Sequence, residues 1–469
     1  MKILLVNPPE FNTSRYDKPS MPSYTPPLGI ASLAAVLLRE GFDIEVADLL
    51  FCQWNKVRRI IEEKSPQVVG ITCLTERRAS VYRLSRIIKE INPAIKVVLG
   101  GVHPFFMYKQ ILKNLPVDVV VLGEGERTFL NLIRAWEKGI SLAEIKGIAF
   151  KEDQEVIKNE DVELIEDLDL LPPAAYHLFD LDRYQRYGIL RGINYRGKRL
   201  EKLRFATVVT SRGCINRCQF CSTNIFWGCK WRKQSARKVI DDLEILSKKY
   251  SCGYINFGDD TFTVDQNRVI EICKGILSRK LDLIWDCETH VDFVSAEMLG
   301  WMKQAGCFSI AYGVESASAT ILDTINKKTT VGQILNAFEL TREAGIKTKI
   351  LLMVGNPNES EETISETVRL LERLKPDFRA VQLTMVFPGT ALYELAKTKR
   401  MINDEYWLTD LPQPYYTAER SRSQLRRWAD ELMQVGAPKW ENLIRYLRWS
   451  IEDKTRLRIT RKGIHIVSP

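Results

Sequence analysis

Residues 211–221 read SRGCINRCQFC and place Cys214, Cys218 and Cys221 on one short stretch. This stretch follows the apolar residues 205–210, so we expect a loop at the end of a strand. Cysteine thiolates are the usual ligands of iron–sulfur clusters. Three thiolates can hold three irons of a 4Fe–4S cluster and leave the fourth iron open to a substrate or cofactor. An open iron indicates chemistry at the cluster rather than electron transfer alone.

A structural zinc site is the alternative interpretation, with Cys229 as the fourth ligand. Zinc knuckles usually pair their ligands as C-x2-C units, and only Cys218 and Cys221 have that spacing. The other cysteines show no second cluster spacing, and buried cysteines usually behave as small hydrophobes. The pattern therefore favours iron over zinc.

Length and composition indicate a globular protein of two or three domains, with 469 residues, 45% hydrophobic and 27% charged. The longest apolar runs, such as residues 117–122, are too short to span a bilayer. The N-terminus, MKILLVNPPE, turns to prolines after five apolar residues and does not resemble a signal peptide. We therefore expect a cytoplasmic protein whose ten cysteines are reduced.

The first third alternates short apolar strands, at residues 2–6, 43–47, 67–71, 96–99 and 118–122, with helical stretches. This alternation predicts an open, doubly wound parallel sheet of the Rossmann-like α/β class, with ligands at the carboxyl ends of its strands. Glycines, prolines and polar residues gather at those ends: Asn7, Pro8, Leu28, Gly29, Thr72, Gly100, Gly101, His103, Gly123, Glu124, Gly125 and Glu126.

These strand ends resemble the cobalamin-binding domain of class B radical S-adenosylmethionine (SAM) enzymes, in the NPP, PPLG, GG-x-H-P and GEGE segments. The resemblance implies that residues 1–140 bind cobalamin through the twelve residues named above. The D-x-H-x-x-G motif, whose His ligates cobalt in many B12 proteins, is absent, because Gly101 stands two residues before His103. We therefore expect cobalamin without a His ligand to cobalt, and His103 as a loop or rim residue.

A hairpin near residues 147–157 and an acidic, proline-bearing stretch suggest a connecting region at residues 141–195. From residue 205 strands and longer helices alternate again, with strands expected at 205–210, 254–258, 283–287, 307–313, 347–354 and 380–386. Repeated βα units of this length predict a barrel or part of one, with its active site at the strand C-termini. The six units resemble the partial (β/α)6 barrel of radical SAM enzymes, over residues 196–400.

The cysteine run matches the family's C-x3-C-x-aromatic-C signature, with Phe220 at the aromatic position. Further segments resemble family motifs: the GDD turn, the GVES segment and the PGT turn at residues 388–390. A solvated acidic turn is the alternative interpretation of GDD. The resemblance implies SAM binding by Phe220, Gly258, Asp259, Asp260, Glu288, Glu315, Ser316 and Gly355.

The implied activity is reductive cleavage of SAM to a 5′-deoxyadenosyl radical at a 4Fe–4S cluster, with cobalamin as second cofactor. Methylation of an unactivated carbon is the leading hypothesis. A cobalamin-dependent cyclase of the anaerobic porphyrin cyclase type is the alternative, and an iron–sulfur electron carrier or redox sensor is an alternative of another class. We expect a small-molecule or lipid-like substrate and an electron donor such as flavodoxin or ferredoxin.

The C-terminal residues 401–469 are expected to form a basic helical region. Residues 420–469 carry 12 Lys and Arg against 5 Asp and Glu, whereas the rest of the chain is nearly neutral. Residues 439–451 have apolar side chains at helical spacing, which predicts either packing against the barrel or contact with an anionic membrane surface. No nucleic-acid-binding module accompanies the charge, so we expect no nucleic acid.

Overall fold

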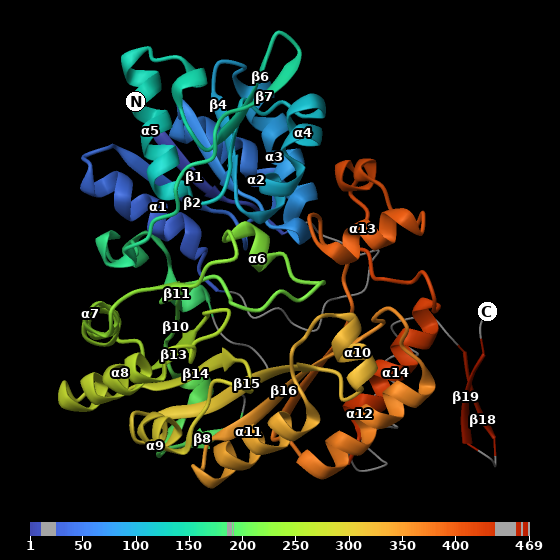
Figure 1. Ribbon diagram of the computed structural model, residues 1–469. Helices are drawn as coiled ribbons and strands as arrows, with labels where there is room; N and C mark the ends of the chain where they lie inside the picture. Colours follow the sequence, from blue (N-terminus) through green and yellow to red (C-terminus); the bar gives the residue numbers. More distant parts are fainter. Residues whose placement is uncertain (11–24, 185–189, 191, 437–455, 461–462, 468–469) are drawn as a thin grey trace.

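The computed structural model describes residues 1–10, 25–184, 190, 192–436, 456–460 and 463–467. Two sheets lie one above the other, each with its own helices (Figure 1). The first sheet is formed by the N-terminal third of the chain and the second by residues from 205 onward. The strand–helix alternation predicted for both parts is confirmed.

The first sheet has seven strands in the order β2-β1-β3-β4-β5-β6-β7. They are β1 (Ile3–Asn7), β2 (Ile44–Asp48), β3 (Val68–Thr72), β4 (Lys96–Gly100), β5 (Val119–Val121), β6 (Ile148–Glu152) and β7 (Glu155–Lys158). Strands β1 to β5 are parallel, as predicted, and the hairpin β6–β7 adds to the edge of the sheet in antiparallel fashion. The hairpin therefore extends the first sheet instead of standing apart in the connection.

Helices cover both faces of this sheet. Helices α1 (Leu28–Arg39) and α5 (Gly125–Lys138) pack together on one face, and α2 (Trp54–Lys64), α3 (Arg78–Ile91) and α4 (Val102–Asn114) pack on the other. The strand order reverses between β1 and β3, so helices leave these neighbouring strands toward opposite faces. In doubly wound sheets ligands bind in the crevice at such a switch point.

The segment after β7 connects the two sheets and packs against both. The Ala175 amide donates to the Ala31 carbonyl on α1 at 3.0 Å, and the Tyr176 hydroxyl donates to the Thr207 carbonyl at 2.7 Å. Tyr184, further along, donates to Asp48 at the end of β2. Apolar side chains of this segment join the core of the α1/α5 face to the core of the second sheet. The connection is thus a packed element of the interface.

The second sheet has six parallel strands in the order β10-β13-β14-β15-β16-β17. They are β10 (Phe205–Val208), β13 (Tyr254–Phe257), β14 (Ile284–Thr289), β15 (Cys307–Glu315), β16 (Lys347–Val354) and β17 (Phe378–Leu383). The main helices between and after them are α7 (Ala236–Lys248), α8 (Gln266–Ser278), α9 (Ala296–Gln304), α10 (Ala319–Thr324), α11 (Val331–Glu343), α12 (Glu361–Leu374) and α13 (Ala391–Thr398). The six predicted strands are confirmed, in sequence order, as an open partial barrel.

The C-terminal region is helical only in part. Helix α14 (Arg422–Gln434) buries Leu425, Trp428 and Leu432 against α12 and β17. Beyond it, β18 (Arg456–Thr460) and β19 (Gly463–Val467) form an antiparallel hairpin that we did not predict. Its alternating sequence RLRIT has the two-residue period of a strand, which the expectation of a helical tail overlooked. The amphipathic stretch 439–451 lies outside the described residues.

No helix within the described part of the chain has the length and apolar character needed to cross a bilayer.

Candidate functional site

The cysteine loop, residues 213–222, connects β11 (Ser211–Arg212) to the short helix α6 (Thr223–Phe226) at the end of the first strand of the second sheet. The three thiols are partly exposed and form no disulfide. The loop is held from outside: Gln219 N donates to the Ile325 carbonyl at 2.9 Å, and Asn326 Nδ2 donates to the Arg217 carbonyl at 2.7 Å. The backbone is therefore fixed while the thiols remain accessible.

The arrangement of the thiols distinguishes iron from zinc. A zinc ion needs four ligands that converge on one point. Among the residues that the structure describes, no group of three or more His, Cys, Asp or Glu side chains converges in that way. Cluster ligands each bind a different iron atom, so they need not meet at a point. Cys229 is exposed and does not complete a zinc site with Cys218 and Cys221.

Burial raises the pKa of the Cys218 thiol to about 11 and also raises that of Cys221. Thiolate ligands must therefore be stabilised by the iron that they bind, as in other thiolate sites. This requirement couples cluster insertion to loss of two or more thiol protons. The loop fits a cluster rather than a set of free, reactive cysteines.

The turn after β13 contacts the cysteine loop through two threonines. Thr261 Oγ1 lies 3.4 Å from Cys214 Sγ, and Thr223 Oγ1 donates to Asp260 Oδ1 at 3.3 Å. Desolvation by neighbouring atoms and the charge of Asp259 raise the pKa of Asp260 to about 6. The Asp260 side chain is exposed at the same turn. It is thus a carboxylate beside the cysteine loop that remains accessible to a ligand.

A buried ion pair lies on the other side of the loop. Lys327 Nζ is 3.2 Å from Glu315 Oε1, and both side chains are about nine-tenths buried. Although burial acts to lower the pKa of Lys327, Glu315 and the neighbouring Cys218 raise it overall, so the ammonium stays charged. Glu315 adopts a left-handed backbone at φ 68°, and a Cβ at Gly313 would lie 2.8 Å from its Oε1. The GVES segment thus shapes this pair.

Sequence reasoning missed Lys327. The only signal was the pair Lys327–Lys328, of which the first is buried and the second exposed. The charge of Lys327 acts on both Cys218 and Cys214, so it is a buried cation beside the cysteine loop.

The structure separates the SAM residues predicted from the family motifs into two groups. Gly258, Asp260 and Glu288 are exposed at strand ends of the second sheet. The others are used internally. Asp259 is buried and accepts hydrogen bonds from Ser211 and Thr210, which fixes β10 to the start of β11.

Of three further predicted SAM residues, two are also buried, and Phe220 is half-buried. Ser316 is 1% exposed, and its Oγ accepts a hydrogen bond from Ser318 N. The Gly355 amide donates to Glu359, and a Cβ at Gly355 would lie 2.9 Å from Leu425 of α14. Phe220 packs against an apolar cluster that contains residues of both halves. SAM contact by Asp259, Ser316, Gly355 and Phe220 stays a prediction.

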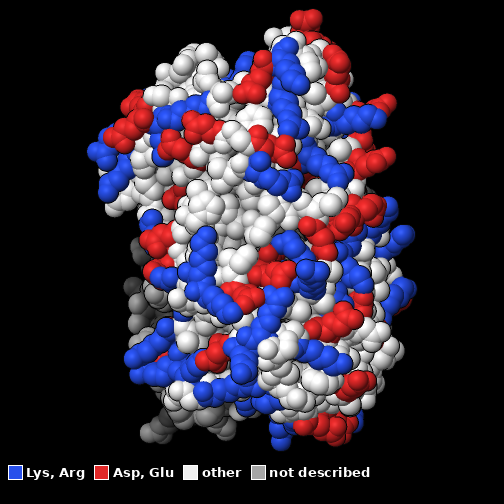
Figure 2. All heavy atoms as spheres, turned by 90° about the vertical axis from the view of Figure 1, so that its left-hand side faces the viewer, with Lys and Arg blue, Asp and Glu red and all other residues white. Residues whose placement is uncertain are grey.

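A cavity of about 550 Å³ lies between the two sheets at the carboxyl ends of β1, β3, β4 and β5. Its walls are mostly apolar and include residues of α1, the connecting segment and α7. Figure 2 shows that uncharged side chains gather at mid-height on this side of the molecule, between charged surfaces above and below. Nine of the twelve predicted cobalamin residues line the cavity: Leu28, Gly29, Thr72, Gly100, Gly101, Gly123, Glu124, Gly125 and Glu126.

Four of these glycines leave open space beside the backbone. A Cβ built at Gly29, Gly100, Gly123 or Gly125 meets no atom within 4 Å. Side chains there would project into room that a bulky ligand needs, and glycine lets the ligand approach the backbone closely. The open space beside these glycines and the mostly apolar walls leave room for a bulky ligand, which agrees with the cobalamin expected for this part of the chain.

The other three predicted residues do not line the cavity. Asn7 is 2% exposed and its Nδ2 donates to Asp48 Oδ1 at 2.8 Å, and Pro8 beside it is buried. His103 is fully buried, its Nε2 lies 2.7 Å from the Tyr82 hydroxyl, and burial lowers its pKa to about 3. His103 is therefore a neutral core residue, and the expectation of a rim position is corrected.

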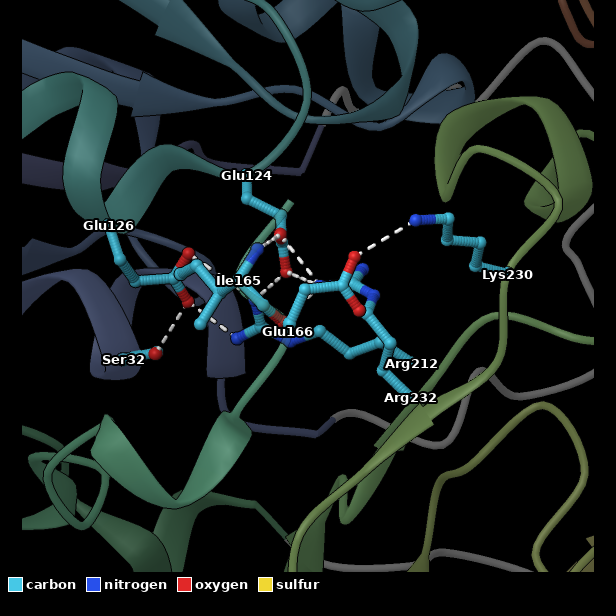
Figure 3. Close-up of polar contacts among 8 residues, drawn as sticks. All are labelled: Ser32, Glu124, Glu126, Ile165, Glu166, Arg212, Lys230 and Arg232. Carbon is cyan, nitrogen blue, oxygen red and sulfur yellow. Dashed lines mark hydrogen bonds and ion pairs between the residues drawn. The ribbon is translucent and has the colours of Figure 1, made fainter. Parts of the chain in front are cut away.

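The two glutamates of the GEGE turn hold arginines from the second half (Figure 3). Arg212 of β11 donates to Glu124 and, at 2.6 Å, to Glu126. Arg232 of β12 (Arg232–Lys233) donates to both Glu124 oxygens at 3.0 and 2.8 Å. These carboxylates face the cavity but are also committed to a connection between the two halves, which sequence reasoning did not foresee.

The cysteine loop and the cavity share a wall. Arg212 lies two residues before Cys214, and Ser222 and Thr223 directly follow Cys221. All three line the cavity. A ligand in the cavity and a cluster on the cysteine loop would thus lie on adjoining surfaces.

Comparison with known proteins agrees with this arrangement. The family model "B12 binding domain" matches residues 20–133, and the model "Radical SAM superfamily" matches residues 208–371. These two models imply cobalamin for the first part of the chain, and a 4Fe–4S cluster with SAM for the second. The first match lies within the part of the chain that forms the first sheet and its helices, and the second match lies within the part that forms the second.

An uncharacterised methyltransferase of Pyrococcus horikoshii is 33% identical over 410 residues, which cover 87% of this chain and 85% of the relative. The anaerobic magnesium-protoporphyrin IX monomethyl ester cyclase of Rubrivivax gelatinosus is 32% identical over 79% of this chain and 66% of its own length. Among solved structures, the radical SAM methyltransferase TsrM of Kitasatospora setae, with cobalamin and a [4Fe-4S] cluster bound, has the same fold. Its TM-score is 0.69 at 20% identity, over 85% of this chain and 75% of TsrM. The chain belongs to the radical SAM family, in the branch whose members carry a B12-binding domain ahead of the radical SAM domain.

Proposed function

We propose that the protein is a cobalamin-dependent radical SAM enzyme that methylates an unactivated carbon. The observation that best supports this function is the shared wall, because Arg212, Ser222 and Thr223 flank the cysteines and also line the cavity. Two cofactors bound there would lie next to one another, as transfer between them requires. The similarity to a methyltransferase over most of both chains supports the same reaction.

The chain's residues have the following roles in this proposal. Cys214, Cys218 and Cys221 hold three irons of the cluster. Asp260, Glu288 and Gly258, at exposed strand ends of the second sheet, would bind SAM, while the Lys327 ammonium would balance negative charge beside the thiolates. When bound, the cluster supplies the electron that cleaves SAM and the corrinoid supplies a carrier for the methyl group.

Fewer residues are proposed to contact cobalamin than the sequence indicated. Gly29, Gly100, Gly123 and Gly125 form the cradle against which the cofactor rests, and Leu28, Thr72 and Gly101 complete that side of the cavity. Apolar side chains of the opposite wall exclude water from the ligand. His103, Asn7 and Pro8 act through packing.

Product counting tests the proposal and separates it from its alternatives. Methylation with SAM as methyl donor yields one S-adenosylhomocysteine and one 5′-deoxyadenosine per product. A cyclase, as the Rubrivivax relative is named, yields no S-adenosylhomocysteine. The anaerobically reduced, cofactor-loaded protein should therefore form both SAM products; without a methyl acceptor, S-adenosylhomocysteine should form only until the corrinoid is methylated, because nothing then removes the methyl group. Formation of 5′-deoxyadenosine alone would favour the cyclase, and absence of both would favour an electron carrier.

We also propose a function for each part of the chain. Residues 1–140, extended by the hairpin β6–β7, bind cobalamin. Residues 141–195 otherwise connect the halves, residues 196–400 bind the cluster and SAM, and residues 401–469 cover the barrel edge through α14.

The remaining partners are a small-molecule or lipid-like substrate and a low-potential electron donor such as flavodoxin or ferredoxin. We place the protein in the cytoplasm, where its free cysteines stay reduced, and assign peripheral contact with anionic membranes to the basic residues 420–469. Flotation with acidic liposomes tests the membrane contact, and recovery of the protein only in the dense fraction would contradict it.

A further inference from the structure

The contact between the GEGE turn and the cysteine-loop hairpin is a buried, charged network (Figure 3). The side chains of Arg212, Glu124 and Glu126 are 13%, 2% and 7% exposed. Burial acts to raise the pKa of Glu126, but Arg212 and a 2.7 Å hydrogen bond from Ser32 hold it below the usual value. Arg212 donates to Glu124 and, at 2.6 Å, to Glu126, so one guanidinium holds both carboxylates of the turn.

The network joins four separate segments of the chain. Ser32 belongs to α1, and Glu124 and Glu126 belong to the turn between β5 and α5. Ile165 belongs to the connecting segment: its amide donates to Glu124 at 2.7 Å, and its carbonyl accepts from Arg232 at 2.6 Å. Exposed ion pairs contribute little, whereas breaking a buried ion pair by removing one partner is costly, so these buried contacts hold the four segments together.

The network is connected to the cysteine loop through Gly213, whose backbone conformation and surroundings are restricted. Gly213, between Arg212 and Cys214, has a left-handed φ of 89°, and a Cβ there would lie 2.0 Å from the Lys230 carbonyl. Arg212 also pairs with Arg232 across β11 and β12. The Lys230 carbonyl leaves no room for a side chain at Gly213, so the position between Arg212 and Cys214 is restricted to glycine and the network lies directly beside the first cysteine.

The network also faces the ligand side. Glu124, Glu126 and Arg212 line the cavity, as does Trp227, whose ring centre is 5.5 Å from the Arg212 guanidinium. A ligand in the cavity therefore touches the residues that hold the cysteine loop.

We propose that Arg212 is a positioning residue that couples the two cofactor sites, so that a corrinoid in the cavity and SAM at the cysteine loop strengthen each other's binding. This inference rests on the proposed function. Coupling free energies between sites are reciprocal, so each ligand must change the affinity of the other by the same factor. The expected factor is about fivefold or more, the lower end of usual couplings.

The experiment uses the full-length protein with a reconstituted cluster, hydroxocobalamin and SAM. The dissociation constant of hydroxocobalamin is measured by equilibrium dialysis with and without saturating SAM, and that of SAM with and without hydroxocobalamin. In the wild-type protein both ratios should agree at about fivefold or more. In Arg212→Lys, which cannot make the forked contact to two carboxylates, both ligands should bind and the ratio should fall to about one.

Two further variants keep the test decisive. Glu126→Gln removes the charge but little volume, and it should also abolish the coupling if Arg212→Lys does not fold. Arg204→Lys is the matched control, since Arg204 makes a forked pair with Asp182 at an exposed site. It should leave the ratio unchanged. A second readout is the electron paramagnetic resonance spectrum of the reduced cluster, which hydroxocobalamin should alter in the wild-type protein and not in Arg212→Lys.

The outcomes distinguish this inference from the proposed function. Binding of both ligands by the wild-type protein with a ratio of one would overturn the coupling and leave the function intact. An unchanged ratio in both Arg212→Lys and Glu126→Gln would also overturn it. Failure of the wild-type protein to bind any corrinoid would overturn the proposed function, and the coupling with it.

Discussion

The helices of the two sheets begin in different ways. Helices α1 to α5 of the first half have no side-chain hydrogen bond at their N-caps, which are Pro27, Gln53, Arg77, Gly101 and Glu124. In the second half, α7, α8, α9, α11, α12 and α13 are each capped by the side chain of the preceding Ser, Asp or Thr. The first four backbone amides of a helix have no hydrogen-bond partner within the helix. A side chain binds one of these amides in each of the six capped helices, and none does so in α1 to α5.

This difference indicates where each half meets its ligand. The starts of α1 and α5 and the glycines before α4 lie on the cavity, so amides without a side-chain cap face the space where cobalamin is proposed to bind. Such amides favour anionic groups, including phosphate. In the second half six helices are capped by side chains, whereas α6 and α10 are not, and the proposed ligand contacts come from thiols and carboxylates on the loops. We therefore expect the first half to contact its cofactor mainly through backbone atoms, and the second half through side chains.

The largest expected effect concerns the second half, where side chains are proposed to contact the ligands. Replacing Cys214, Cys218 or Cys221 by Ala should abolish cluster assembly and SAM cleavage, because each thiolate holds its own iron. Corrinoid binding should persist, since the nine predicted cobalamin residues on the cavity wall all belong to the first half. Iron, sulfide and corrinoid analysis after anaerobic purification measures both. Cys229→Ala is the control and should retain the iron, and loss of iron in that variant would reinstate a four-cysteine site.

A bulky side chain at a cavity glycine of the first half should block corrinoid binding. Gly29→Trp places a large side chain in the open space beside the cavity, and we expect corrinoid affinity to fall by at least about tenfold, a loss of about 1.4 kcal/mol. The iron content should not change. Gly300→Trp is the matched control, because a Cβ at Gly300 in α9 also meets no atom within 4 Å. Equal corrinoid affinity in Gly29→Trp and wild type would contradict the assignment of the cradle.

A smaller effect concerns a buried acid in the capped half. Glu359 accepts hydrogen bonds from the Gly355 and Asn356 amides, and burial raises its pKa from 4.5 to about 7. The folded state therefore favours the neutral acid, and this stabilisation is complete below pH 4.5 and lost as the pH rises through 7. Between those limits the stability of wild type relative to Glu359→Gln should fall by about 1–3 kcal/mol.

Urea unfolding of both proteins across this pH range measures the difference. Glu361→Gln, on the exposed start of α12, serves as the control and should follow the wild-type profile. A gap between wild type and Glu359→Gln that is constant with pH would contradict the raised pKa.

The smallest effect compares two helix starts directly. Ser360 and Thr363 form a capping box at α12, so Ser360→Ala should cost about 1 kcal/mol of stability. Gln53→Ala, at the uncapped start of α2, should change stability by less than about 0.5 kcal/mol. Denaturant midpoints at a single pH give both values. Similar losses in the two variants would remove the contrast between the halves.

The fold was largely predictable because parallel strands followed by helices leave a regular pattern in the sequence. Five strands of the first sheet and six of the second were expected near their observed positions. The hairpin β18–β19 was not predicted because its strands are only five residues long and follow a stretch, residues 439–451, whose apolar side chains recur at helical spacing. The cysteine loop and the glycine cradle were also predictable, since spacing and residue type carry their chemistry locally.

The roles of the polar motif residues were not predictable in the same way, because their partners are distant in sequence. Glu124 binds Arg212 and Arg232, which lie 88 and 108 residues away. Asp259 is bonded by Ser211, 48 residues earlier, and His103 is buried against Tyr82. Lys327 likewise becomes significant only when the chain brings it to the cysteine loop. A motif can thus mark a site without its polar side chains touching the cofactor.

The central claim is that the two halves bind two different cofactors on adjoining surfaces. The most direct test is anaerobic purification with cobalamin supplied, followed by iron, sulfide and corrinoid quantitation and a UV–visible spectrum. We predict about four irons, about four sulfides and about one corrinoid per chain. Iron without corrinoid would contradict the role of the cavity, and zinc in place of iron would contradict the role of the cysteine loop.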